Sequence, residues 1–222
     1  KLSICMIVGR EEANLKRCLD SFLPVIHEPW CELVIVVTQG GDRTLEVAFE
    51  YTDKVFTQAW QDDFSFHRNF ANSHATGERI MTVDADEELP QECLYKLQDY
   101  ILNPQYGHVN TFFFSIRSFH TLDRVQYSTI LQPRVFNNRK TPIYAGTVHN
   151  RPECMEPFFF ANDIIFNHYG YMWDKKPELL QKKTERSLPM LEKAYEEKKG
   201  DLHILTHLLK THYTAHQFDR VI

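Results

Sequence analysis

Four short apolar runs, each separated from the next by a stretch with helical character, constrain the fold of this chain more than any other feature. The runs are LSICMIV (2–8), ELVIVVT (32–38), KVFTQAW (54–60) and RIMTV (79–83). Nearly uninterrupted apolar runs of this length are typical of strands that are buried on both faces of a parallel sheet. Because parallel strands need crossover connections, helices with right-handed connections are expected between them.

The intervening segments have the pattern of these helices. The segment 39–51 begins with turn glycines and a candidate N-cap at Asp42, and the segment 62–77 is expected to form a helix that Gly77 closes. The sequence therefore predicts an α/β domain in which ligands bind beyond the carboxyl ends of the strands. In the first connection, apolar residues recur at helical spacing up to Pro24, namely Leu15, Cys18, Leu19, Phe22 and Leu23.

The fourth run continues directly into an acidic segment that contains Asp84, Asp86, Glu87 and Glu88. Carboxylates this close repel one another, and a divalent cation is the simplest group that would compensate them. Asp84 and Asp86 can face one point past the strand end, where Mg²⁺ or Mn²⁺ would bind them together with water and a substrate phosphate. The pattern favours a nucleoside diphosphate substrate. The alternative is a solvated acidic loop that caps the next helix.

The second half of the chain has a different residue pattern from the first. After a helix that Pro90 opens, we expect added strands and loops in three aromatic stretches, VNTFFFSIRSF (109–119), RVQYSTILQPRVF (124–136) and DIIFNHYGYM (163–172). From about residue 176 the sequence is charged and helical. We therefore expect a sheet domain over 1–175 and a C-terminal helical extension over 176–222, which could be the start of a helical repeat.

Composition excludes some classes of function. The formal net charge is −5, which disfavours a protein that holds polyanions by bulk electrostatics. The five cysteines are scattered, without the close spacing of a zinc or redox site, so we interpret them as reduced thiols of a cytoplasmic protein. No apolar run reaches the length of roughly 18 residues that spans a bilayer.

Two motifs in order, WQDDFSFHRNF (60–70) and VDADEEL (83–89), resemble family-two glycosyltransferases of the GT-A fold. They match the branch with W-x-D-D-F-S-x-x-R-N and D-A-D-E-x-L, and SICMIVGREEANLKRCLDSF (3–22) resembles the family's opening strand, acidic turn and helix. The resemblance covers about residues 1–170. It implies a mostly parallel, Rossmann-like sheet and a metal-dependent, inverting transfer of a hexosyl or N-acetylhexosaminyl group from a nucleoside diphosphate sugar, most often a UDP-sugar.

The resemblance also implies roles for single residues. Asp84 matches the position that touches the ribose or a metal-bound water, and Asp86 matches the direct ligand of Mn²⁺ or Mg²⁺. Asp63 and Arg68 match positions that hold the uracil and ribose side of the nucleotide or brace that pocket. For these two residues the alternative is structural, a cap at the helix start together with a surface ion pair.

The resemblance also suggests roles for residues after the first strand and in the segment 132–150. Glu11 or Glu12 lies at the end of the first strand, where the base of the nucleotide would enter. QPRVFNNRKTPIYAGTVHN resembles the family segment R-x-F … Y-x-G-x-x-H-E, so that Arg134 would neutralise the leaving group. His149 would complete the metal shell or touch the diphosphate, with a purely structural histidine as the alternative.

Two departures from the family pattern keep other functions open. Val37 stands where the family usually has an aspartate that reads the base, and Asn150 replaces a glutamate. They motivate the alternative of a nucleotide-sugar-binding module without turnover. A nucleotidyltransferase is less favoured, since VGREEANLKR lacks the Gly-rich, basic phosphate loop that such an enzyme should carry after its first strand.

The catalytic base and the acceptor stay open. In an inverting transfer a carboxylate deprotonates the acceptor opposite the leaving group. Candidates downstream of the metal motif are Asp123, Glu153 and Glu156. Acceptors in this family include lipids, glycans, proteins and modified nucleic-acid bases.

Overall fold

The computed structural model describes residues 1–139, 142–147, 150–172 and 177–214. All strand pairs of the first half are parallel, with β2 between β1 and β3 and β4 on the other side of β1. The carboxyl ends of these strands therefore meet at one edge, as predicted. The elements of this half are β1 (Leu2–Val8), α1 (Glu12–Ile26), β2 (Cys31–Val37), α2 (Thr44–Phe49), β3 (Val55–Thr57), α3 (Phe64–Ser73) and β4 (Arg79–Thr82).

The second half extends the same sheet with strands of mixed direction. The strand order is β3-β2-β1-β4-β7-β6-β10-β5, in which β7 is antiparallel to both of its neighbours and β10 runs parallel to β6. Strands β8 and β9 form a separate pair. The elements are β5 (Glu87–Glu88), α4 (Gln91–Leu102), the short 3-10 helix η1 (Pro104–Tyr106), β6 (Thr111–Phe119), β7 (Tyr127–Asn137), β8 (Tyr144–Ala145), β9 (Arg151–Pro152) and β10 (Phe158–His168).

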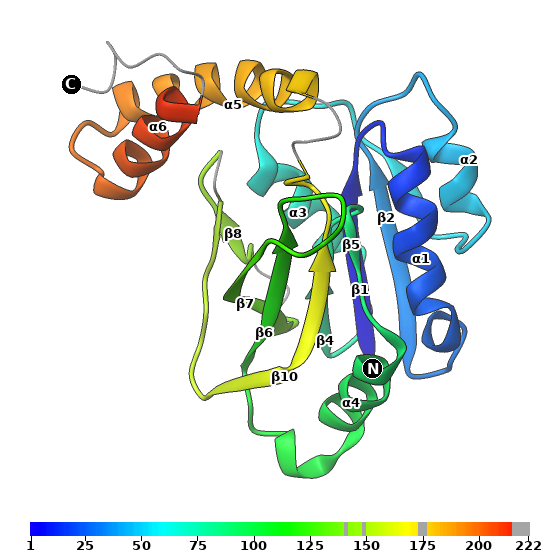
Figure 1. The fold of residues 1–222 in the computed structure, drawn as a ribbon. Helices are drawn as coiled ribbons and strands as arrows, with labels where there is room; N and C mark the ends of the chain where they lie inside the picture. The colour runs from blue at the N-terminus through cyan, green and yellow to red at the C-terminus, as the bar shows by residue number, and fades with distance from the viewer. Residues whose placement is uncertain (140–141, 148–149, 173–176, 215–222) are drawn as a thin grey trace.

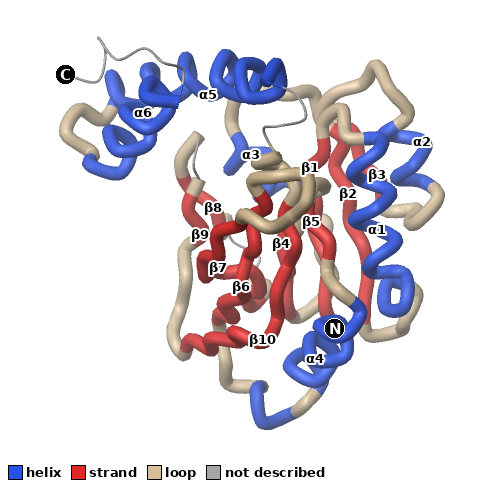
Figure 2. Tube along the Cα trace, in the orientation of Figure 1, coloured by secondary structure: helices blue, strands red, loops and turns tan. Residues whose placement is uncertain are grey.

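Helices cover both faces of the parallel half of the sheet (Figures 1 and 2). Side chains alternate along β1, so that Ile4 and Met6 pack into the core with α1, α2 and α4, whereas Cys5 packs on the opposite face with Ala71 of α3. Because each central strand is buried on both faces, its apolar run is nearly continuous in the sequence.

Two elements end earlier than the sequence predicts. Strand β3 stops at Thr57, and the indole of Trp60 instead stacks on the ring of His67 at a centroid distance of 4.9 Å. Helix α3 stops at Ser73, so Gly77 does not close it. A Cβ at Gly77 would lie 2.8 Å from the carbonyl oxygen of Lys1 and 2.9 Å from the carbonyl carbon of Leu2, so glycine permits a close approach to β1.

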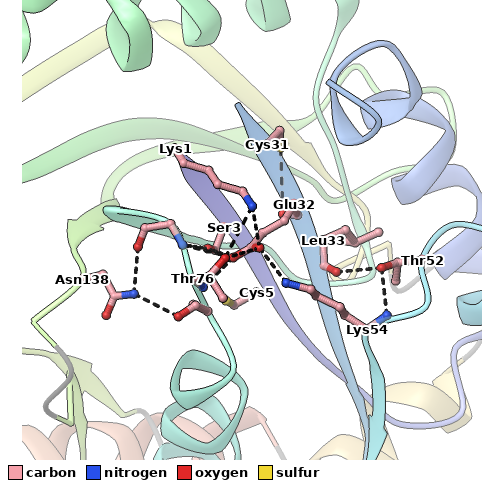
Figure 3. Close-up of polar contacts among 12 residues, drawn as sticks. Lys1, Ser3, Cys5, Cys31, Glu32, Leu33, Thr52, Lys54, Thr76 and Asn138 are labelled. Atoms are coloured by element: carbon pink, nitrogen blue, oxygen red, sulfur yellow. Dashed lines mark hydrogen bonds and ion pairs between the residues drawn. The ribbon is translucent and has the colours of Figure 1, made fainter. Parts of the chain in front are cut away.

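A buried carboxylate, Glu32 of β2, joins the segment before β4 to β1 and β2. Its oxygens accept hydrogen bonds from Ser3 Oγ, from the Thr76 backbone N–H at 2.6 Å and from Lys54 Nζ at 2.8 Å (Figure 3). Burial opposes ionisation, but these hydrogen bonds outweigh it and lower the pKa of Glu32 well below its ordinary value. The group is therefore a charged, fully bonded support of the fold.

Replacing Glu32 by glutamine should lower the free energy of unfolding by about 2 to 4 kcal/mol at neutral pH, because several charge-assisted hydrogen bonds are weakened. Since the pKa is lowered in the folded protein, this stabilisation is complete above about pH 4.3 and is lost as the pH falls through the lowered pKa. Urea unfolding of both proteins at pH 7 and at pH 3 measures this difference. Glu28→Gln, at an exposed position, is the control. The prediction would be contradicted if the parent and Glu32→Gln differed in free energy of unfolding by the same amount at both pH values.

The C-terminal region forms two helices, α5 (Pro177–Glu197) and α6 (Leu202–Thr214); α5 lies above α3 in Figure 1, and α6 lies to its left. Leu191 and Leu208 are buried between them, and this cluster packs against Trp60 and Phe64 of the sheet domain. The division into 1–175 and 176–222 stays a prediction. None of the described helices has the length and apolar character needed to cross a membrane.

Candidate active site

The acidic segment after β4 is fixed by its pairing with a distant strand. β5 runs antiparallel to the end of β10, with Glu87 opposite His168. This register brings His168 Nε2 to 3.2 Å from Asp86 Oδ2, while the other ring nitrogen of His168 lies 3.0 Å from Ser118 Oγ. Burial of the ring opposes protonation, but the hydrogen bond and charge of Asp86 outweigh it and raise the pKa of His168.

Gly170 leaves room for this carboxylate and imidazole. A Cβ at position 170 would lie 2.2 Å from Asp86 Oδ2 and 2.8 Å from His168 Nε2, and both distances are shorter than any stable contact. The backbone N–H of the preceding residue, Tyr169, donates to the carbonyl oxygen of Asp86 at 3.0 Å. A Cβ at position 170 would therefore require the side chain of Asp86 or His168 to move.

Asp84 is held between two guanidinium groups. Arg68 of α3 donates from Nη2 to Asp84 Oδ1 at 2.7 Å, and Arg134 Nη1 of β7 lies 3.9 Å from Oδ2. Burial opposes ionisation of Asp84, but the two arginines outweigh it and hold its pKa well below the ordinary value. Asp84 is therefore a carboxylate at any pH near neutrality.

Arg134 also pairs with Glu87, which is 1% exposed and whose pKa is raised to about 7 because burial outweighs the attraction of Arg134. Its Nη2 donates to Glu87 Oε1, and the other oxygen of Glu87 accepts the backbone N–H of Asp84 at 3.0 Å. Protein side chains thus offset much of the negative charge of the acidic segment. The sequence suggests a divalent cation as the simplest group for this role. Within the described residues, no group of three or more His, Cys, Asp or Glu side chains is placed to hold a metal ion.

A cavity of about 400 Å³ opens at this edge of the sheet. The ends of β1 and β2 and the start of α3 contribute to its wall, and so does Arg186 of α5. Ionisable groups dominate the lining, and a pocket with several carboxylates and guanidinium groups is suited to a charged, polar ligand. These groups are Arg10, Glu11, Arg68, Asp84, Asp86, His168, Tyr171 and Arg186.

A second cavity, of about 570 Å³, lies on the other side of Asp84. It shares Arg68 and Asp84 with the first cavity and is otherwise lined by Thr82 of β4 and by residues of β7, the β8–β9 region and α6. Asn150, at which the sequence departs from the family pattern, is part of its wall. Arg68 and Asp84 therefore form a wall that the two cavities share.

Four candidate nucleotide-binding residues near the first cavity have different surroundings in the structure. Glu11 lines it, whereas Glu12 faces a different surface and contacts Arg43, with its Oε2 accepting the backbone N–H of that residue at 3.3 Å. Asp63 caps α3 by accepting the Phe66 N–H at 2.9 Å, which agrees with the structural alternative for this residue. Arg68 points instead to Asp84.

The candidate bases lie away from both cavities in the described part of the chain. Asp123 is in the exposed turn between β6 and β7, where it accepts a hydrogen bond from Thr121 at 2.6 Å. Glu153 pairs with Arg139 at 3.4 Å, and Glu156 precedes Pro157 on an exposed loop. All three stay predictions. His149, the candidate third metal ligand, lies outside the described residues.

Sequence reasoning assigned no role to two residues of the first cavity. Only the β5–β10 register places His168 beside Asp86. Arg186 belongs to no motif, and it reaches the cavity because α5 packs over Trp60 and Phe64.

This chain belongs to glycosyl transferase family 2, whose family model matches residues 3–164. A TPR repeat-containing protein of Synechococcus elongatus is 36% identical over 185 residues, which cover 79% of this chain and 43% of that protein. The SPbeta prophage-derived glycosyltransferase SunS of Bacillus subtilis is 25% identical over 84% of this chain and 43% of its own length. The chain thus spans less than half the length of these relatives.

Solved structures show the same fold. The crystal structure of residues 1–349 of S. aureus TarS has a TM-score of 0.59 at 14% identity and covers 99% of this chain and 73% of that one. The same protein in complex with UDP-GlcNAc has a TM-score of 0.58 at 11% identity, covering 95% and 79%. The predicted GT-A fold is therefore confirmed.

Proposed function

We propose that this chain transfers a sugar from a nucleoside diphosphate sugar, with UDP as the nucleotide, to an acceptor, with inversion at the sugar. The observation that carries the proposal is the cavity in which Asp84, Asp86, Arg68 and Glu11 meet at the carboxyl edge of a family-2 sheet. The likeness of the fold to TarS, a protein crystallised with UDP-GlcNAc, supports the choice of nucleotide.

The residues present fit a divalent cation, Mn²⁺ or Mg²⁺. Asp86 Oδ2 and His168 Nε2 lie 3.2 Å apart beside a glycine, so the carboxylate and the imidazole, once it has lost its Nε2 proton, could bind one ion from the same side. Water and the donor's phosphates would supply the remaining ligands. A bound cation would offset the charge that develops on the departing diphosphate.

The chain's own residues would orient the donor. Arg68 holds Asp84 as a carboxylate, which can then accept a hydrogen bond from a ribose hydroxyl. Ser118 and Asp86 fix the orientation of the His168 ring from its two nitrogens. The acceptor would enter through the second cavity, so that it meets the donor across Asp84. Its class, the identity of the base and a cytoplasmic location stay predictions.

Donor turnover tests the proposal. The protein should release UDP from at least one of UDP-glucose, UDP-galactose and UDP-N-acetylglucosamine in the presence of Mn²⁺, even by slow hydrolysis, and EDTA should stop the release. A protein that binds a UDP-sugar but never releases UDP would be the non-catalytic module that Val37 and Asn150 suggest. Mass measurement of whatever the protein modifies would then identify the acceptor.

Replacing Gly170 by alanine should lower Mn²⁺-dependent UDP release about tenfold at limiting metal, because the new Cβ must displace Asp86 or His168. Excess Mn²⁺ should restore part of the activity. Titrating activity against Mn²⁺ for both proteins measures the effect. Gly40→Ala, at a site where a Cβ would have no atom within 4 Å, serves as the control. An unchanged metal dependence would show that this pair does not bind the cation.

A further inference from the structure

The C-terminal helices pack directly beside the first cavity. Leu191 and Leu208 form their common core, and Trp60 and Phe64 of the sheet domain pack against it. Trp60 and Phe64 also line the cavity. Arg186 of α5 also lines this cavity, and Figure 1 shows α5 above α3, the helix that carries Phe64.

Arg186 of α5 lies at this contact. Its guanidinium carbon is 5.3 Å from the centre of the Phe64 ring, a distance at which a cation and an aromatic face attract each other. The side chain is exposed, lines the cavity and is close enough to Glu11 and Asp86 to interact electrostatically with both. Stacking on Phe64 thus holds the guanidinium at the cavity beside two carboxylates.

Each of the other arginine side chains of the described cavity wall already has a hydrogen-bond acceptor. Arg68 donates to Asp84 at 2.7 Å, and Arg10 donates to the carbonyl oxygen of Gly40 at 2.8 Å. Arg186 has no hydrogen bond or ion pair with any described residue. Its donors are therefore available to a ligand in the cavity without breaking an existing bond.

We infer that Arg186 binds the diphosphate of the donor, so that the C-terminal helices supply part of the donor site. The inference rests on the proposed function and adds to it a residue outside the region that the family model matches. A guanidinium group can donate two parallel hydrogen bonds to phosphate oxygens, which an ammonium group cannot reproduce. It would also offset the repulsion between the diphosphate and the carboxylates of Glu11 and Asp86.

The test compares two ligands that differ only in the diphosphate. Calorimetry in Mn²⁺ gives the Kd of UDP, and displacement of UDP gives the Kd of uridine. Arg186→Ala should raise the Kd of UDP at least about fivefold, or about 1 kcal/mol, and leave the Kd of uridine within about twofold of the parent. Arg186→Lys should recover only part of the loss, because it restores the charge without the planar fork.

Lys193→Ala is the matched control, since it removes one positive charge from an exposed position on the same helix. It should bind UDP as the parent does. Unchanged UDP binding by Arg186→Ala would overturn the inference, and so would an equal loss of UDP and uridine affinity, which would indicate a distorted pocket. If the parent itself fails to bind UDP, the proposed function is rejected. If the parent binds UDP and Arg186→Ala binds it equally well, the proposed function stands and only the inference about Arg186 is rejected.

Discussion

Sugar transfer by an Asp86→Asn protein should be at least about a hundredfold slower than by the parent, with the fold intact. Asparagine has the shape of aspartate, but it supplies no negative charge to a cation or to His168, which lies 3.2 Å away. Loss of one preorganised electrostatic contact at a reacting group commonly costs this much in rate. The side chain is partly exposed at the cavity, so its replacement should have little effect on stability.

The measurement is kcat/KM for UDP release at several Mn²⁺ concentrations, together with the thermal transition. Asp53→Asn, which changes an exposed carboxylate in the turn before β3, should leave both unchanged. Full activity of Asp86→Asn at limiting Mn²⁺ would show that Asp86 does not bind the metal ion. A collapse of the thermal transition would instead assign it a structural role.

The second large effect concerns Arg134. We expect Arg134→Met to lower the free energy of unfolding by about 3 to 5 kcal/mol, because Glu87 would remain buried without its partner. Methionine fills much of the same space, so the loss reports the uncompensated charge more than a void. Asp84 would also lose one of its two guanidinium neighbours.

Urea unfolding measures this loss, and a double variant identifies its cause. Arg134→Met combined with Glu87→Leu should recover at least half of the stability, because a buried ion pair replaced on both sides leaves no unpaired charge. A double variant as unstable as the single one would show that packing, not charge, dominates. The role of Arg134 at the leaving group stays a prediction; normal UDP affinity in a folded Arg134→Met protein would contradict it.

Much of the parallel half could be predicted because its signals are local. The apolar runs of β1, β2 and β4 and the helical spacing of α1 each depend on residues a few positions apart. The D-x-D pattern similarly placed Asp84 and Asp86 at the carboxyl edge, where the cavity lies. Element ends were less predictable. Trp60 leaves the strand because its ring stacks on His67, a residue of the next helix.

The sequence by itself determined the class of fold, the edge of the sheet that carries the site and the two aspartates at its centre, since all three follow from short-range spacing. Tertiary structure alone decided which charges meet there. Arg134 reaches Glu87 because β7 runs beside β4, and His168 reaches Asp86 through the register of β10 with β5. Arg186 reaches the cavity on a helix about a hundred residues after the two aspartates. These contacts depend on how distant elements pack, and no local spacing in the chain encodes that packing.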